Sequence, residues 1–465
     1  MKVRKLLTVL AVLALVAASC GDSGSTTTDA PSTEAPTTEA PSTEAPATEA
    51  PATEAPTTEP EMAMPVGDFG FDPETGTIKL GVLAATTGPI ADIGKTLLAG
   101  HQAYWGAVNA NGGILGTYPV ELVIRDNAYN PEQNVTVYNE IKDEVLAFSS
   151  TLGTPTTATI YEDAGQNDLA VNAGSLASQW ALTDNVVLNL GSNTYFAQFA
   201  NGPYWAMEIA DPPVITDDSV VGIVYQADDY GDDCKNGYDL AQENLAFNAA
   251  YEATYAATDT DFSAQVGGAQ AAGVDVLFVC TLPTALATMA GTAAALQYFP
   301  ALFGSSPSYI NVLNAALGGG DPVAGAALFN TFPFYNLGTS AEWEEDLPGM
   351  QAMRAITEAA GVPIEAVTAF YFFGFTQAQT FEKILEVALE NGDVTRKGVL
   401  AAIDQVQNVD LGVGVGAAGY GPTPKDRIST NVDAVGIVTA DNQFGLERIS
   451  DFFEAPYMAD WDPAG

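Results

Sequence analysis

Short, β-rich apolar runs alternate with helix-like stretches along most of this chain, and they do so in two separate series. The first series has such runs at 78–84, 119–126, 146–152 and 169–174, and the second has them at 220–226, 251–257 and 274–280. Strands that alternate with helices at this spacing are typical of parallel sheets covered by helices on both faces. The pattern therefore predicts an α/β fold class with two similar lobes, because residues 191–214 separate the two series.

Two loops that follow predicted strands carry hydroxyl groups, and sheets of this kind bind ligands beyond the C-terminal ends of their strands. The loop 153–159 offers Thr154 and Thr156, and the loop 172–178 offers Ser175. Neutral hydroxyls and backbone donors suit a single carboxylate better than a phosphate, to which Arg or Lys usually binds. Helix N-capping is the alternative role for each residue, but two such loops in one lobe favour binding.

Motifs for nucleotide binding and catalysis do not fit this sequence. The glycines of 81–94 are seven and six residues apart, which is not a dinucleotide fingerprint. The P-loop spacing fails as well, because Pro89 stands where that motif needs Gly. His101 is the one histidine, it lies in a predicted helix, and no nucleophile elbow accompanies it. We expect His101 to be a structural or surface residue and the protein not to be an enzyme.

The N-terminal region predicts export and a membrane anchor. Basic residues and an apolar run make up a secretory signal peptide at 1–19. Small residues directly before Cys20 resemble the bacterial lipobox, although Ala17 holds the place where Leu is usual. The resemblance implies that Cys20 is lipidated, and an ordinary signal peptide with a chance cysteine is the alternative.

A linker follows the signal segment. Residues 31–60 repeat a Pro/Thr/Glu/Ala unit with proline at every fifth position and no large apolar residue. Such a segment cannot build a core and favours an extended, semi-rigid spacer. The sequence predicts a disordered Pro/Thr/Glu linker over 20–76.

Charge limits the partners of the mature chain. Three of the 15 basic residues and none of the acidic ones lie in the first 19 positions, so 12 basic residues face 58 acidic ones, a formal charge of −46. Nucleic acid and anionic lipid are poor partners for such a surface, because both need Lys and Arg against phosphate. We expect an extracytoplasmic protein that contacts the membrane through its lipid anchor only.

The two remaining cysteines, Cys234 and Cys280, leave two interpretations open. A disulfide is permitted outside the cytoplasm, and both cysteines are expected at the same end of neighbouring strands. Otherwise they are small buried hydrophobes. Two cysteines and one histidine are too few for a zinc site built on those residues, and we expect no metal and no cofactor.

A long helix is predicted at 371–392, where it ends in Asn391-Gly392. Its aromatic residues Phe372 and Phe375 share the helix with polar Gln379 and Glu382. We expect these aromatics to belong to the core rather than to a binding site.

A family resemblance rests on three stretches. Residues 78–135 combine a strand, Thr-Gly-Pro, a helix, Asn-x-x-Gly-Gly-Ile-x-Gly, Arg-Asp and Asn-Pro. Residues 220–237 and the Asp-Phe-Ser unit at 259–279 add to the pattern. Together they resemble type I periplasmic solute-binding proteins of the branched-chain amino-acid transporter family, from about Thr77 to Phe453.

The resemblance implies two Rossmann-like lobes, joined by three crossings, that close on a small solute. Lobe 1 is expected at 77–194 plus 326–425, and lobe 2 at 195–325 plus 426–465. It also implies a monomer whose closed form is recognised by permease subunits of an ABC importer.

The resemblance assigns ligand-binding roles to several residues. In amino-acid-binding members, the loop after the third strand supplies a hydroxyl, and Thr154 and Thr156 lie there. The loop after the fourth strand supplies backbone and a hydroxyl, which match Ala173 and Ser175. An aromatic residue of lobe 2 covers the ligand, and Tyr230 matches it.

Three positions depart from the family pattern. Ile93 stands where lobe 1 usually has an aromatic lid, and Thr281 or Leu282 replaces an aromatic of lobe 2. Ser306 lies near the place of the acid that pairs with the α-ammonium group. An unpaired buried ammonium would cost several kcal/mol, so a standard amino acid is in doubt, whereas carboxylates, amides and neutral solutes stay open.

The sequence thus indicates a solute-binding lipoprotein that serves an ABC importer and binds an amino acid, amide or carboxylate-like solute. A ligand-sensing receptor module of the same fold is the alternative, and a secreted enzyme is a remote one. A permease operon beside the gene would separate transport from sensing.

Overall fold

The computed structural model describes residues 64–188, 192–338, 341–407, 409–414 and 419–465. They belong to one compact unit, Met62–Gly465. The predicted signal peptide at 1–19, the predicted lipidation of Cys20 and most of the predicted linker lie outside the described residues.

The first lobe is built on a five-stranded sheet of order β3-β2-β4-β5-β6 in which every pairing is parallel. Its strands are β2 (Ile78–Ala84), β3 (Val120–Asp126), β4 (Ala147–Leu152), β5 (Val171–Gly174) and β6 (Val187–Leu188). All residues of β4 and β5 are buried, as expected for central parallel strands with both faces covered.

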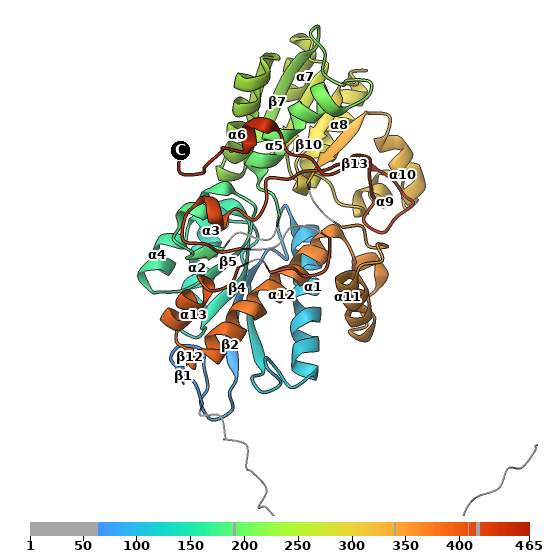
Figure 1. Ribbon diagram of the computed structural model, residues 1–465. Coiled ribbons are helices and arrows are strands. Elements are labelled where there is room, and N and C mark those ends of the chain that lie inside the picture. The colour runs from blue at the N-terminus through green and yellow to red at the C-terminus, as the bar shows by residue number, and fades with distance from the viewer. Residues whose placement is uncertain (1–63, 189–191, 339–340, 408, 415–418) are drawn as a thin grey trace, which may run out of the picture. The chain divides into compact units, whose positions relative to one another are not determined.

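Helices from two distant parts of the chain cover this sheet. They are α1 (Ala91–Ala110), α2 (Pro131–Ile141), α3 (Thr154–Ala158), α4 (Tyr161–Gln166), α11 (Pro348–Ala359), α12 (Ala369–Glu390) and α13 (Arg396–Ile403). Although they are far apart in sequence, α1 and α12 lie side by side (Figure 1). The first lobe therefore forms only after the chain returns from the second.

The second lobe has a seven-stranded sheet of order β14-β13-β11-β10-β9-β7-β8. Its strands are β7 (Val220–Gln226), β8 (Asn248–Tyr255), β9 (Val276–Cys280), β10 (Ala301–Gly304), β11 (Phe334–Leu337), β13 (Val435–Val438) and β14 (Leu446–Arg448). The strands from β7 to β11 pair in parallel, whereas β13 runs antiparallel to both β11 and β14.

The helices of the second lobe are α5 (Tyr195–Tyr204), α6 (Asp229–Leu245), α7 (Ser263–Ala271), α8 (Pro283–Ala295), α9 (Val312–Leu317) and α10 (Pro322–Phe329). In Figure 1 the green-to-yellow middle of the chain and its red end form this lobe, and the blue-to-teal and orange segments form the first. The predicted α/β class with two lobes is confirmed.

Three segments cross between the lobes: one between β6 and α5, one between β11 and α11, and one directly before β13. They meet at Asp433, whose side chain is fully buried. Its carboxyl accepts a hydrogen bond of 2.8 Å from the Ala434 backbone N–H, and Asn193 on the first crossing and Gly338 on the second lie beside it. The hinge thus brings together residues that are more than 200 positions apart.

Two predicted domain boundaries are wrong. The linker was expected to reach residue 76, yet β1 (Val66–Gly67) pairs in parallel with β12 (Asp393–Val394). The return to lobe 1 was expected at 326, but β11 pairs with β10 inside the second sheet, so the crossing follows Leu337. A two-residue strand has no sequence signature of its own, and pairing partners this distant cannot be read from local patterns.

A disulfide joins Cys234 and Cys280, with their Cα atoms 6.3 Å apart. Of the two interpretations left open by the sequence, the disulfide is the one present: Cys234 lies near the start of α6, which follows β7, and Cys280 ends the neighbouring strand β9. The bond ties a covering helix to a central strand. Among the described residues, no helix is long and apolar enough to cross a membrane.

Candidate solute-binding site

A cavity of about 160 Å³ lies where the two lobes face each other. Its walls come from the ends of β4 and β5 in lobe 1, from the ends of β10 and β11 in lobe 2, and from the crossings. At about 10–15 Å³ per water on the same measure, the space corresponds to on the order of ten water molecules. It is large enough for a small organic molecule.

The lobe 1 wall contains Thr154 and Gly174 at the ends of the two central strands. The Thr154 hydroxyl shares a hydrogen bond of 2.7 Å with the Ser175 hydroxyl. Ser175 also accepts a hydrogen bond of 3.0 Å from the Trp180 indole, and only 1% of its surface is exposed. Ser175 therefore supports Thr154 from behind instead of facing the cavity.

The predicted residues Thr156 and Ala173 are likewise fully buried behind the lining. The Thr156 hydroxyl donates to the carbonyls of Leu152 at 2.7 Å and of Gly153 at 2.9 Å. This is not helix N-capping, because the N-cap residue of α3 is Gly153 and no side chain caps that helix. Gly153, Thr154 and Gly174 line this wall of the cavity instead.

On the lobe 2 side, Tyr230 lines the cavity and its hydroxyl bonds to Ser305 at 2.6 Å and to the Thr281 carbonyl at 3.1 Å. Its ring meets that of Tyr195 edge-on, with ring centres 4.7 Å apart. Burial raises the pKa of Tyr195 to about 12, so this phenol is neutral and able to donate a hydrogen bond. Thr281 is buried behind the lining and Leu282 takes its place.

Ser306 and Ile93 also line the cavity, as predicted. The Ser306 backbone N–H donates to the Gln198 side-chain oxygen at 2.8 Å, and the Gln198 amide donates to the Ser306 hydroxyl at 3.1 Å. Gln198 thus satisfies the polar atoms at the place where amino-acid-binding members have an acid. The sequence placed Thr154, Tyr230, Ser306 and Ile93 around one cavity, and their role in binding stays a prediction.

Hydrogen bonds connect the lobes across the cleft. The Gln226 amide of lobe 2 donates to the Tyr129 hydroxyl of lobe 1 at 3.1 Å. The Ser178 backbone N–H donates to Asp233 on α6 at 3.1 Å, and the Ser178 hydroxyl donates to the same carboxylate. Burial raises the pKa of Asp233 to about 6. Because these bonds need both lobes in contact, the structure is a closed form.

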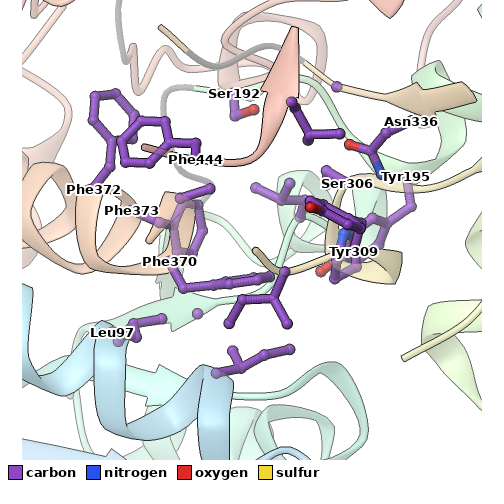
Figure 2. Close-up of a pocket in the computed structure, with 18 of the residues that line it drawn as sticks. Leu97, Ser192, Tyr195, Ser306, Tyr309, Asn336, Phe370, Phe372, Phe373 and Phe444 are labelled. Carbon is purple, nitrogen blue, oxygen red and sulfur yellow. The ribbon is translucent and has the colours of Figure 1, made fainter. Parts of the chain in front are cut away.

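A cluster of aromatic side chains forms the other half of the cavity, and the sequence did not predict its role. Figure 2 shows Phe370, Phe372, Phe373 and Phe444 on one side, opposite Ser306, Tyr195, Tyr309 and Asn336. We expected the aromatics of the long helix to be core residues. Phe375 is a core residue as expected, but Phe370, Phe372 and Phe373 also line the cavity. A local sequence does not show which residues of α12 the second lobe leaves uncovered.

The only charged side chains among the described lining residues are Glu342 and Arg448. Glu342 accepts a hydrogen bond of 3.2 Å from the Arg448 backbone N–H, and the Arg448 guanidinium lies 3.4 Å from Glu345. It also packs over Phe452, at 4.8 Å from the ring centre. The Arg448 charge is therefore paired within the protein, and the Glu342 carboxylate is bound by a neutral backbone donor.

His101 lies outside the cavity lining and is fully buried. One ring nitrogen lies 3.3 Å from the Gly374 carbonyl, and the other accepts a hydrogen bond of 3.2 Å from the Trp105 indole. Burial lowers the pKa of His101 to about 4. It is the structural histidine that the sequence indicated. Within the described part of the chain, no group of three or more His, Cys, Asp or Glu side chains could hold a metal ion.

Two parallel-sheet lobes, three crossings and a cavity between them define the class of type I periplasmic solute-binding proteins. The sequence profile of the family described as periplasmic binding protein matches residues 77–440. The chain belongs to this family, whose members are binding proteins and not enzymes.

Curated relatives agree with that family. The chain is 25% identical over 210 residues to the "Leucine-, isoleucine-, valine-, threonine-, and alanine-binding protein" of Pseudomonas aeruginosa, which covers 43% of this chain and 53% of that protein. It is 33% identical over 92 residues to the "Leu/Ile/Val-binding protein" of Escherichia coli K12, or 19% of this chain and 25% of that one. The chain thus matches about half of the first relative's length and a quarter of the second's.

Solved structures share the fold over nearly their whole length. A "Fatty acid ABC transporter substrate-binding protein from Thermomonospora curvata" has a TM-score of 0.75 at 24% identity, covering 86% of this chain and 97% of that one. A Thermus thermophilus branched-chain amino-acid transporter structure with bound valine has a TM-score of 0.68 at 16% identity, with 84% and 98% covered. A Rhodopseudomonas palustris solute-binding protein in complex with 4-hydroxybenzoate has a TM-score of 0.66 at 17% identity, and the match covers 81% of this chain and 97% of that one.

Proposed function

We propose that this protein is an extracytoplasmic solute-binding lipoprotein that captures a small organic solute between its lobes and delivers it to an ABC importer. The observation that supports the proposal is a cavity with walls from both lobes and from the crossings. A solute in such a cavity contacts both lobes at once, so it binds the closed form better than the open one and shifts the population toward closure.

The cavity favours a solute with an apolar body. Ser306 stands at the place of the acid that binds the α-ammonium group in amino-acid-binding members, and Gln198 binds its N–H and its hydroxyl oxygen. Glu342, the one acid among the described lining residues, accepts a hydrogen bond from the Arg448 backbone N–H. Names of relatives and neighbours include amino acids, a fatty acid and 4-hydroxybenzoate, which supports an organic solute and spans several classes. Among the sequence-based options, a carboxylate or neutral solute agrees best with this lining.

Binding is tested by a thermal-shift screen of amino acids, amides, and aliphatic and aromatic acids, because selective binding to the native state raises the melting temperature. A solute found in this way is then titrated against Thr154→Val, which keeps the shape of the side chain and removes its hydroxyl. Loss of one hydrogen bond should weaken binding about tenfold. Thr136→Val, on the exposed side of α2, is the matched control and should bind as the wild type does.

A panel in which no compound shifts the melting temperature would contradict the solute-binding proposal. Equal affinity of the Thr154→Val variant and the wild type would contradict the site instead. Delivery is tested by uptake of the labelled solute in cells that lack this gene. If uptake persists while a response to the solute is lost, the protein is a sensing receptor and not a transport component.

The lipid anchor is part of the proposal and rests on Cys20 after a signal-like segment. Cys20→Ser should move the protein from the membrane fraction to the soluble fraction and end the incorporation of labelled fatty acid. Unchanged membrane association of this variant would show that another feature holds the protein there.

A further inference from the structure

The cavity is elongated along α12. Ala369, Phe373, Thr376 and Thr380 all line it, and their spacing of four, three and four residues places them on one face of the helix. From Ala369 to Thr380 the helix advances about 16 Å at 1.5 Å per residue. A compact ring or a short amino acid fills only a part of that length.

The lining along this stretch is apolar. Phe370 and Phe373 come from α12, while Phe444 and Leu446 come from the turn and strand that follow β13. The Thr376 hydroxyl is 3.1 Å from the carbonyls of Phe372 and Phe373 within its own helix. A helix threonine bonded in this way offers no free donor, so the tail of a bound solute meets apolar surface there.

The opposite half of the cavity holds neutral hydrogen-bonding groups. Thr154, Tyr195 and Ser306 lie there, and the pKa of Tyr195 is raised by burial, so its hydroxyl keeps its proton. Figure 2 shows Ser306, Tyr195 and Asn336 facing the aromatic cluster from the other side. Hydroxyl groups that donate hydrogen bonds suit an oxygen-bearing head. The Arg448 guanidinium is paired with Glu345, and the Glu342 carboxylate accepts a hydrogen bond from the Arg448 backbone N–H.

We propose that the solute is a linear aliphatic acid, with its carboxyl group at the hydroxyl-bearing half and its tail along α12 in the aromatic half. Three bonds of an extended backbone span about 3.3–3.6 Å, so a stretch of about 16 Å holds roughly 14 carbon atoms. This inference rests on the proposed function, because it names the solute class of the same cavity.

The test is a titration of the full-length protein, stripped of bound lipid by unfolding and refolding, with saturated acids from butanoate to hexadecanoate. Each added methylene group should tighten binding about threefold to fourfold until the apolar stretch is filled, and then the affinity should level off. Leucine, 4-hydroxybenzoate and dodecanol complete the panel. We expect dodecanoate to bind more tightly than all three.

Variants on α12 connect the chain-length profile to the structure. Thr376→Leu fills the middle of the stretch and should make the affinity level off several carbons earlier than in the wild type. Gln379→Leu lies on the same helix but outside the lining, and its profile should match the wild type. Phe373→Ala widens the stretch and should move the plateau to longer chains, which gives an independent measurement if the leucine variant does not fold.

A flat chain-length profile, or identical profiles for Thr376→Leu and Gln379→Leu, would overturn the inference. Dodecanol binding as tightly as dodecanoate would overturn the acid head. If leucine or 4-hydroxybenzoate binds and the acids do not, the solute class is wrong but the proposed function stands. If nothing in this panel or in the broader screen binds, the proposed function itself fails.

Discussion

Single buried side chains with shifted pKa values mark the places where the two lobes depend on each other. Asp433 is fully buried at the meeting point of the three crossings, and burial raises its pKa to about 8. Asp233 joins the lobes through Ser178 and has its pKa raised to about 6 for the same reason. Both carboxyls are costly to ionise where they lie, because burial disfavours the charged form.

Asp433 makes the stability of the protein dependent on pH. The unfolded chain releases this proton near the ordinary pKa of 3.8, while the folded chain keeps it up to about pH 8. Between those values the native state binds more protons than the unfolded state, so this group makes stability fall as pH rises. Asp433→Asn removes the effect, because an amide does not ionise.

Urea unfolding of the wild type and Asp433→Asn, in steps from about pH 4 to about pH 9, measures this difference. The free energy of unfolding of the variant should be close to that of the wild type at about pH 4, and should exceed it by an increasing amount toward about pH 9. His101, whose lowered pKa acts in the opposite direction between about 4 and 6.5, is present in both proteins and cancels. Parallel pH profiles would show that Asp433 is ionised in the folded protein.

At the scale of helices, the contact of α1 with α12 brings two backbones together without side chains between them. A Cβ atom added at Gly374 would lie 2.0 Å from the Leu97 carbonyl oxygen, and one added at Gly100 would lie 2.0 Å from that of Tyr371. Both neighbours are helix backbone and cannot turn aside as a side chain can. Close packing here fixes the position of α12 against the N-terminal half of α1.

Gly374→Ala should therefore destabilise the protein by about 1–3 kcal/mol, as insertion of a methyl group into a packed interior does. Gly106 is the matched control, because it lies within α1 and a Cβ there meets nothing within 4 Å. Gly106→Ala should stabilise the protein by roughly 0.5–1 kcal/mol through helix propensity. Thermal unfolding of both variants measures the contrast, and a neutral Gly374→Ala would mean that the helices can separate at little cost.

For the whole molecule, closure is the property on which binding depends. Ser178 in lobe 1 gives two hydrogen bonds to Asp233 in lobe 2, and Gln226 reaches across to Tyr129. These contacts do not touch the aromatic half of the cavity. Ser178 and Asp233 lie outside the cavity lining, so their bonds contribute to affinity by stabilising the closed form and not by contacting the solute.

Ser178→Ala removes one of the bonds to a carboxylate and should weaken solute binding about tenfold, since hydrogen bonds to charged groups are worth about 1.5–3 kcal/mol. Calorimetry measures the affinity, and small-angle scattering measures how completely the lobes close at saturating solute. Thr288→Ala, which removes a hydroxyl that bonds only within α8, should change neither. An unaltered affinity in Ser178→Ala would show that these bonds do not control closure.

Much of the fold was predictable because its signals are local. The run 78–84 is the strand β2 residue for residue, and the runs at 146–152 and 220–226 match β4 and β7 to within a residue. Alternation of strands and helices together with the family motifs indicated two lobes and three crossings. Thr154 was predicted to lie at the cavity because it follows a strand end, where sheets of this type form sites. Tyr230 was predicted from the family resemblance.

What only the tertiary structure decided depends on pairs of segments far apart in the chain. No local pattern shows that β11 belongs to the second sheet or that β1 pairs with a strand more than 300 residues later. Nor does one show that Phe444 from lobe 2 packs against Phe372 on α12. Hydrophobicity and periodicity along the sequence predict that a side chain is buried, but they do not predict which residues it packs against. The sequence by itself therefore determined the class of the protein and one wall of its cavity, whereas the aromatic half and the hinge carboxyl came from packing.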